Sequence, residues 1–190
     1  DNSFKGDDLI LGNTSYTNGN NENLTVSAFD YIVSNFVLVT ESGEEVIYPK
    51  EKGYFIISEG GGDKVKNVKV MLEDVPAGMY TQLKFGIGVD QERYIQGQAA
   101  QENFWTKAED YNLTWSWQAG YKFVVLEGGF KSATQIEEKN FMLHIASRGT
   151  TVDLYKEVTL SMETALVSND KSPQIHIQVD ASKMLDGANK

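Results

Sequence analysis

Apolar and polar residues alternate with a period of two along much of the chain, which is typical of β-strands. The clearest case is residues 80–89, where Leu83, Phe85, Ile87 and Val89 fall on one face. Other stretches that alternate or are rich in β-branched and aromatic residues, separated by turn-forming residues, occupy 31–39, 46–48, 54–58, 66–72, 115–126, 141–146, 156–162 and 174–179. We therefore predict an all-β fold, an antiparallel β-sandwich with little helix.

Two features interrupt this alternation. Gly86 and Gly88 lie on the second face of the 80–89 strand, so we expect either bulky side chains to pack there or the backbone to bend. Residues 91–112 are polar and rich in helix-tolerant Ala and Gln. We interpret them as one long loop excursion that includes a helical turn, and such excursions are often functional or mobile.

The length of 190 residues suits one domain with a substantial core. Asn, Thr, Ser and Gly dominate residues 13–23. We interpret residues 1–27 as a loop-rich N-terminal arm, residues 28–187 as a single β domain, and residues 188–190 as a tail. The chain begins at Asp1 without the apolar core of a signal peptide, so we interpret it as trimmed.

Composition excludes several classes of function. The formal net charge of −10 opposes binding to phosphate backbones, and no basic cluster offsets it, so we expect no nucleic-acid partner. Solubility is the simpler explanation of this acidity, with an acidic recognition surface as the alternative. No apolar run approaches the roughly 20 residues that cross a bilayer, so we expect no membrane span. The absence of cysteine removes disulfides, thiolate metal sites and cysteine nucleophiles.

The chain has two histidines, His144 and His176, and both fall in strand patterns. His144 shares a strand face with Met142 and Ala146. The simplest interpretation of each histidine is a place on a polar or half-buried strand face, because a histidine metal site needs both rings and a third donor. Catalytic motifs are missing and carboxylates are scattered, so we predict no enzyme. A hydrolase with paired carboxylates is a distant third hypothesis.

Two other places are candidates for a binding site. Trp115, Trp117, Tyr121 and Phe123 form an unusually aromatic segment, which either fills the core between two sheets or borders a ligand or metal pocket. Asp90 follows a predicted strand and precedes the excursion. Its carboxylate either caps a turn or contributes an oxygen ligand to a hard cation such as calcium.

Several motifs, taken in order along the chain, are similar to those of the MbnP-like family of methanobactin-associated periplasmic proteins. They are Val75-Pro76-Ala77-Gly78-Met79-Tyr80, Phe85-Gly86-Ile87-Gly88-Val89-Asp90, Trp115-Ser116-Trp117-Gln118-Ala119-Gly120-Tyr121-Lys122-Phe123, Leu126-Glu127-Gly128 and Phe141-Met142-Leu143-His144-Ile145. The sequences of these motifs are most similar to those of uncharacterised Bacteroidetes members of the family. The resemblance implies an exported β-sandwich-like domain, either periplasmic or an outer-membrane lipoprotein of a Gram-negative bacterium.

The resemblance also implies a copper site. In the family, the ligands are histidines and a tryptophan that a diheme peroxidase-like partner oxidises to kynurenine. That tryptophan corresponds to Trp115, and the family's histidine two residues later is replaced by Trp117. Because an indole offers no lone pair to a metal, the implied site is incomplete. His144, and after it His176, supply the remaining candidate ligands, and Trp115, Trp117 and His144 are expected to line a pocket near Tyr121.

We therefore predict an exported, non-enzymatic binding domain with an incomplete copper site and an unknown small ligand or surface partner. The alternative is a surface module that binds carbohydrate or protein without metal. It is motivated by four aromatic residues of the excursion that we expect to be exposed: Tyr94, Phe104, Trp105 and Tyr111.

Overall fold

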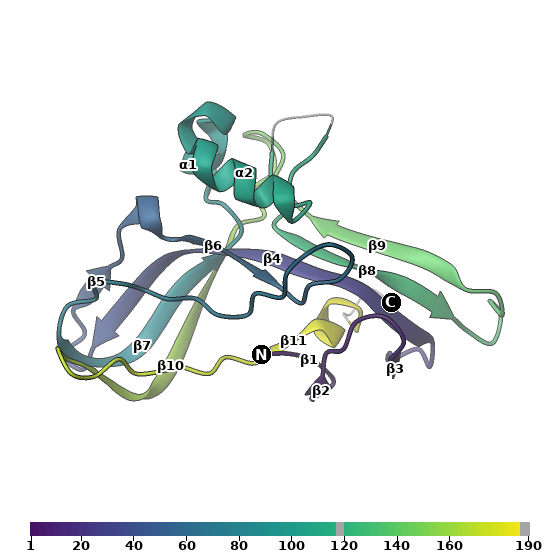
Figure 1. Ribbon diagram of the computed structural model, residues 1–190, viewed down its shortest axis with the longest axis horizontal. Coiled ribbons are helices and arrows are strands. Elements are labelled where there is room, and N and C mark those ends of the chain that lie inside the picture. Colours follow the sequence, from purple (N-terminus) through teal and green to yellow (C-terminus); the bar gives the residue numbers. More distant parts are fainter. Residues whose placement is uncertain (117–119, 187–190) are drawn as a thin grey trace.

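The computed structural model describes residues 1–116 and 120–186 and shows an all-β, sandwich-like fold with little helix (Figure 1). The strands are β1 (Asn2–Phe4), β2 (Asp7–Asp8), β3 (Ser15–Thr17), β4 (Asn23–Thr40), β5 (Glu45–Ile47), β6 (Tyr54–Ser58), β7 (Gly78–Ile87), β8 (Val124–Lys131), β9 (Lys139–Ile145), β10 (Lys156–Val167) and β11 (Val179–Asp180). The helices are η1 (Lys50–Lys52), α1 (Gln91–Ile95), η2 (Gln98–Gln101), α2 (Glu102–Asp110) and η3 (Ala181–Met184). The predicted fold class is confirmed.

Strand β4 is the central strand of the larger sheet. It is 18 residues long and crosses the molecule from end to end (Figure 1). The larger sheet has the order β10-β7-β4-β8-β9, and β3, β5 and β6 also pair with β4. All of these pairs are antiparallel. Strands β8 and β7 pair with the first and second halves of β4, so one strand organises both halves of the sheet.

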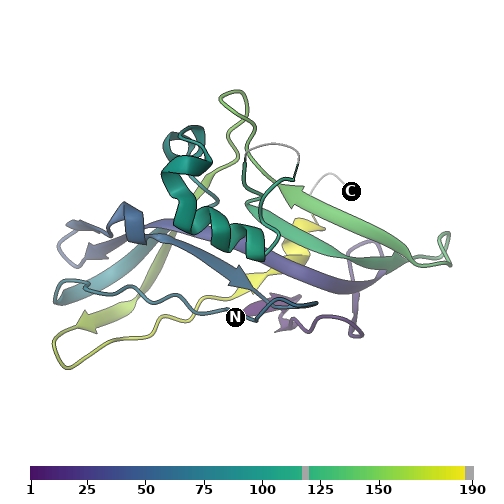
Figure 2. The same ribbon diagram turned by 45° about the horizontal axis from the view of Figure 1, so that its top comes forward.

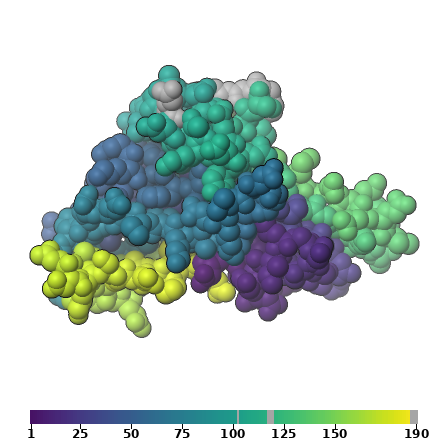
Figure 3. Space-filling model, in the orientation of Figure 1, coloured from purple at the N-terminus to yellow at the C-terminus, as the bar shows by residue number. Residues whose placement is uncertain are grey.

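The N-terminal residues pack against the body of the protein. Strand β1 pairs in parallel with β11 and antiparallel with β2 to form a small second sheet. Phe4 and Leu9 are buried in the core. Figure 3 shows the N-terminal segment, in purple, lying against the rest of the molecule. Strand β4 runs through the proposed boundary between residues 27 and 28, and that division remains a prediction.

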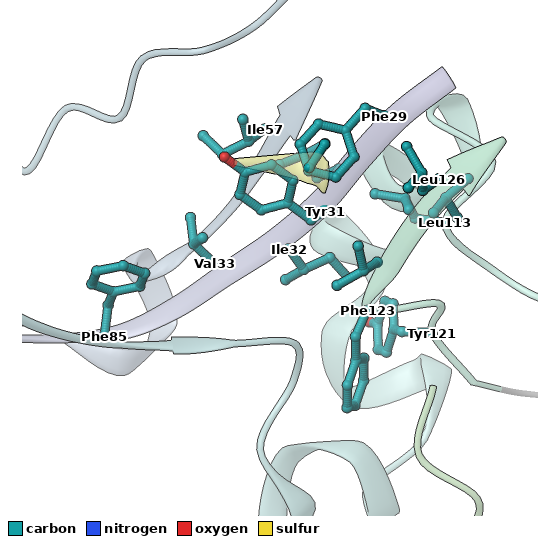
Figure 4. Close-up of a cluster of buried hydrophobic side chains, with 14 of the residues drawn as sticks. Phe29, Tyr31, Ile32, Val33, Ile57, Phe85, Leu113, Tyr121, Phe123 and Leu126 are labelled. Carbon is teal, nitrogen blue, oxygen red and sulfur yellow. The ribbon is translucent and has the colours of Figure 1, made fainter. Parts of the chain in front are cut away.

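The core lies on both faces of β4 and contains the side chains shown in Figure 4. The two glycines of the 80–89 region confirm the expectation of bulky neighbours. A Cβ atom at Gly86 would overlap the ring of Tyr155, and one at Gly88 would overlap the ring of Phe123. Gly88 also has a φ of +102°, which other residues rarely adopt. Each glycine therefore makes room for an aromatic ring against the sheet.

The excursion after β7 is more helical than predicted. Helices α1, η2 and α2 cover one face of the larger sheet, as Figures 1 and 2 show. The expectation of four exposed aromatic residues was wrong, since Tyr94 and Trp105 are buried and Phe104 and Tyr111 are half-buried. The spacing in α2 turns Trp105 and Ala108 toward the core on successive turns. None of the described helices is long and apolar enough to cross a membrane.

The prediction of a continuous strand over residues 115–126 was wrong for its first part. Strand β8 begins only at Val124. Before it, a bridge between Thr114 and Tyr121 closes a loop, and the Trp115 amide donates to the Gly120 carbonyl at 3.2 Å. Residues 66–72 and 174–178 are likewise not strands, apart from one bridge at Asn67. Four partly buried side chains of these segments pack against the core: Val68, Val70, Leu72 and Ile177.

Candidate functional site

A row of polar side chains crosses one face of the larger sheet. His144 of β9 lies opposite Val125 of β8, Val125 lies opposite Asp30 of β4, and Asp30 lies opposite Ser58 of β6. Residues directly opposite each other on neighbouring strands point to the same face. Three polar residues from three strands therefore share this face, with Val125 between them.

His144 is oriented by a carboxylate. Its Nε2 atom lies 2.7 Å from Oε1 of Glu127, which is two residues after Val125 and so lies on the same face. The two side chains are 19% and 26% exposed, so solvent and solutes reach them. Nδ1 of His144 has no hydrogen-bond partner within residues 1–116 and 120–186. Metal-binding histidines commonly use one ring nitrogen for the ion and the other for such a carboxylate.

Trp115 lies beside this pair. The ring centroids of Trp115 and His144 are 5.7 Å apart, in an edge arrangement. Nζ of Lys122 lies 5.1 Å from the centroid of the indole ring and donates to Oδ1 and the carbonyl oxygen of Asn112. Lys122 is buried, which lowers the pKa of its ammonium group, while Glu127 acts in the opposite direction. We call Trp115, Lys122, Glu127 and His144 the Trp115 corner.

Asp30 and Lys64 form a buried ion pair next to the corner. Asp30 is fully buried and accepts hydrogen bonds from the Ser58 hydroxyl and the Lys64 ammonium. Burial raises the pKa of its carboxyl group above the ordinary value, although these two bonds act against the rise. Glu127 raises the pKa further through charge repulsion. The charges of Asp30 and Glu127 are thus opposed by those of Lys64 and Lys122, so the region is close to neutral.

Asp90 occupies a different polar cluster, at the start of the excursion. It is the N-cap residue of α1 and accepts a hydrogen bond from the Arg93 amide. Asn35, Lys50 and Tyr54 also donate to its carboxylate. Burial raises the pKa of Asp90, but the hydrogen bonds outweigh it and lower the pKa to about 2. We call Asp90, Asn35, Lys50 and Tyr54 the Asp90 cluster.

The other candidate residues lie elsewhere or outside the described ranges. Tyr121 is buried in the core, with its ring centroid 5.0 Å from that of Trp105. His176 is exposed on the segment between β10 and β11, which lies apart from β9 in Figures 1 and 2. Trp117 lies outside the described residues. The structure therefore brings Trp115 together with His144, while Tyr121 and Asp90 have structural partners of their own.

Two members of the corner, Glu127 and Lys122, were not singled out as site residues by the sequence. The alternation in residues 124–127 would have placed Glu127 on the face of Val125, but the strand pairing that brings it to His144 is not visible in one sequence. Within the described residues, no three His, Cys, Asp or Glu side chains are arranged to hold a metal ion. The donors that the corner offers are one imidazole and one carboxylate.

The fold and the corner define the class of this protein: a sandwich-like β domain with a half-exposed histidine and tryptophan beside the sheet. The chain belongs to the MbnP family, whose model matches residues 1–190. Among solved structures, MbnP from Methylosinus trichosporium is similar, with a TM-score of 0.57 and 13% sequence identity over 83% of this chain and 68% of that chain. At this identity the likeness concerns the fold. No curated protein sequence matches the chain.

Proposed function

We propose that this protein is an exported, non-enzymatic binding domain of the MbnP family, and that the Trp115 corner is its binding site. One observation carries the proposal. Trp115 and His144, which are 29 positions apart in sequence, meet at a half-exposed place where Glu127 orients the imidazole. When a carboxylate holds one ring nitrogen of a histidine, the other ring nitrogen is oriented to bind a ligand. A surface histidine without a function needs no such carboxylate.

Copper is the ligand class that the family resemblance favours for this site. His144 fits the role of an imidazole ligand, because Glu127 fixes its tautomer and leaves Nδ1 for the ion. By the family resemblance Trp115 corresponds to the modified tryptophan, and its intermediate burial supports access by an oxidising partner. His176 is on a different segment, so the family's two-histidine donor set does not fit the described residues. Calcium at Asp90 is less favoured, because protein donors surround that carboxylate.

The proposed export and the proposed oxidising partner rest on the family resemblance alone. We propose a periplasmic or outer-membrane lipoprotein location, and a diheme peroxidase-like partner if Trp115 is oxidised. Both are separate from the claim about the corner. Intact mass of the protein purified from its native envelope, compared with the mass calculated from the sequence, tests the oxidation of Trp115, and an unmodified mass contradicts it.

Copper loading of two histidine variants tests the site. We expect His144→Gln to lose the bound copper and His176→Gln to keep it, because only the first removes the oriented imidazole. Copper content after desalting, with circular dichroism as the check on folding, gives the answer. Equal copper contents in His144→Gln and the wild type would contradict the proposal.

The carbohydrate-binding alternative loses the observation that motivated it. Trp105 is buried against Tyr121, and its indole Nε1 donates to Glu109 at 2.7 Å. A platform for sugars needs exposed ring faces, so the aromatic residues of the excursion serve to attach it to the sheet.

A further inference from the structure

A small apolar pocket lies in the half of the larger sheet that does not carry the Trp115 corner. It is next to β5, which pairs with the last residues of β4, whereas β8, beside the corner, pairs with the first half of β4 (Figure 1). The end of β5 with Tyr48 and Pro49 forms one wall, and residues 74–76 form the other. Leu38 of β4 also lines the pocket. The pocket is therefore separate from the binding site proposed above.

Two tyrosine hydroxyls hold the walls of this pocket in place. The Tyr48 amide donates to the Phe36 carbonyl at 2.9 Å, and the Tyr48 hydroxyl accepts a hydrogen bond from the Glu73 amide at 3.1 Å. The Tyr80 hydroxyl donates to the Pro76 carbonyl at 2.8 Å. Both tyrosines are buried. The walls are thus fixed before a ligand arrives, and a preformed pocket avoids the cost of ordering on binding.

The size and lining of the pocket limit what it can hold. Its volume is about 170 Å³. An apolar cavity of about 150 Å³ holds one benzene molecule. Among the described residues that line the pocket, only Tyr48 and Asp74 have polar side chains. Ile47, another lining residue, is 74% exposed, so solvent reaches the pocket. One phenyl ring or one branched aliphatic group therefore matches the pocket in size and polarity.

A pair of opposite charges accompanies this pocket. Asp74 lines it, and Oδ2 of Asp74 lies 3.6 Å from Nζ of Lys52. The two side chains are 84% and 56% exposed, and such surface ion pairs are weak, so each charge can exchange its partner for a ligand. Asp74 has a φ of +57°, in the left-handed region that aspartate tolerates. One anionic and one cationic group are thus available beside a pocket of benzene size.

We propose that this pocket binds a free α-amino acid with an aromatic or branched aliphatic side chain. The side chain occupies the apolar pocket, the ammonium group pairs with Asp74, and the carboxylate pairs with Lys52. An α-amino acid fits because it carries both charges on neighbouring groups, next to a single apolar side chain. This site goes beyond the proposed function, because it uses no residue of the Trp115 corner and no metal.

Nuclear magnetic resonance titration of the full, metal-free chain at neutral pH tests this inference. Phenylalanine, phenylethylamine, phenylpropionate and glycine are added separately, and the amide signals of Ile47 and Val75 are followed. We expect phenylalanine to shift these signals with a dissociation constant on the order of 1 mM. The two compounds with a single charge should bind roughly two- to fivefold more weakly, because an exposed ion pair contributes little. Glycine lacks the apolar group and should leave the signals unchanged.

Two variants test the two charges separately. Asp74→Asn should weaken the binding of phenylalanine and phenylethylamine but not of phenylpropionate. Lys52→Gln should weaken the binding of phenylalanine and phenylpropionate but not of phenylethylamine. Asparagine also tolerates the left-handed region, so Asp74→Asn keeps the turn. Asp170→Asn, at an exposed aspartate of a different turn, is the matched control and should leave every affinity unchanged.

The inference is overturned if phenylalanine leaves the Ile47 and Val75 signals unchanged, or shifts them no more than glycine does. Equal binding of the three aromatic compounds would also overturn it, because the charges of Asp74 and Lys52 would then play no part. Copper is absent from every arm of the experiment. Neither result therefore bears on the proposed function of the Trp115 corner.

Discussion

The Asp90 cluster and the Trp115 corner lie at the two ends of the same excursion, yet their polar groups are used in opposite ways. In the Asp90 cluster, one carboxylate receives hydrogen bonds from Asn35, Lys50, Tyr54 and the Arg93 amide. In the corner, Nε2 of His144 is bonded to Glu127, and its Nδ1 has no partner among the residues that the structure describes. The first arrangement satisfies a charge within the protein, and the second leaves a donor atom for something else.

This difference separates a structural cluster from a candidate binding site. Buried polar groups that are fully hydrogen-bonded hold elements in place, and the Asp90 cluster holds α1 against β4 and β6. A half-exposed imidazole with a hydrogen bond at only one of its ring nitrogens contributes little to the stability of the fold. The carboxylate that orients it is therefore better explained by ligand binding. A search for functional sites by perturbed pKa values alone would have chosen Asp90. The lowered pKa of its carboxyl group reflects its structural role.

The largest effect is expected from removing the carboxylate of Asp90. Asp90→Ala loses the N-cap of α1 and leaves Lys50 and Tyr54 without their acceptor, so the free energy of unfolding should fall by about 3 kcal/mol. Urea unfolding followed by tryptophan fluorescence measures this change. Glu92→Ala is the control, because its ion pair with Lys50 is exposed and should contribute under about 0.5 kcal/mol. Similar losses in both variants would show that the cluster is not structural.

Acid should remove the same contribution from the wild type. The pKa of Asp90 is about 2 in the folded protein against an ordinary value of 3.8, so the ionised carboxylate stabilises the fold at higher pH. This stability is complete above the ordinary pKa and is lost as the pH falls through the folded pKa. Between about pH 5 and about pH 2, the advantage of the wild type over Asp90→Asn should shrink by about 2 kcal/mol. Parallel pH profiles for the two proteins would be incompatible with this assignment.

A smaller effect is expected at Glu127, and on binding instead of folding. Glu127→Gln keeps the shape of the side chain but removes the charge that fixes the His144 tautomer, so copper affinity should fall about 10- to 100-fold. Isothermal titration with copper measures the affinity, and unfolding experiments should show a change of about 1 kcal/mol or less. Glu138→Gln, on a half-exposed carboxylate paired with Lys131, is a suitable control. An unchanged affinity in Glu127→Gln would mean that the carboxylate does not orient a ligand.

Much of the fold followed from the period-two pattern. Strand β7 was predicted because side chains alternate strictly along a strand, and for the face of Gly86 and Gly88 either bulky neighbours or a bend of the backbone was expected; the structure has the rings of Tyr155 and Phe123 there. The absence of a strand at residues 113–116 and 120–123 was missed, because the aromatic residues there have high strand propensity and the bridge from Thr114 to Tyr121 is a tertiary contact. The helix α2 was missed because polar residues surround the pair Trp105 and Ala108.

The candidate site was predicted in part. Trp115 and His144 were both expected, but their contact depends on the pairing of β8 with β9 and on the loop that returns Trp115 to the sheet. Glu127 and Lys122 acquire their roles only through that pairing, since nothing in their local sequence differs from a solvated charge. A structural role for Asp90 followed from its place at a strand end, because short acidic side chains cap turns and helices.

The most direct test of the comparison measures copper content and the free energy of unfolding in His144→Gln and Asp90→Ala side by side. The account predicts that His144→Gln loses the copper with little change in stability, and that Asp90→Ala keeps the copper with a large loss of stability. If His144→Gln keeps its copper, or if Asp90→Ala loses it while still folded, the division between a binding corner and a structural cluster is wrong.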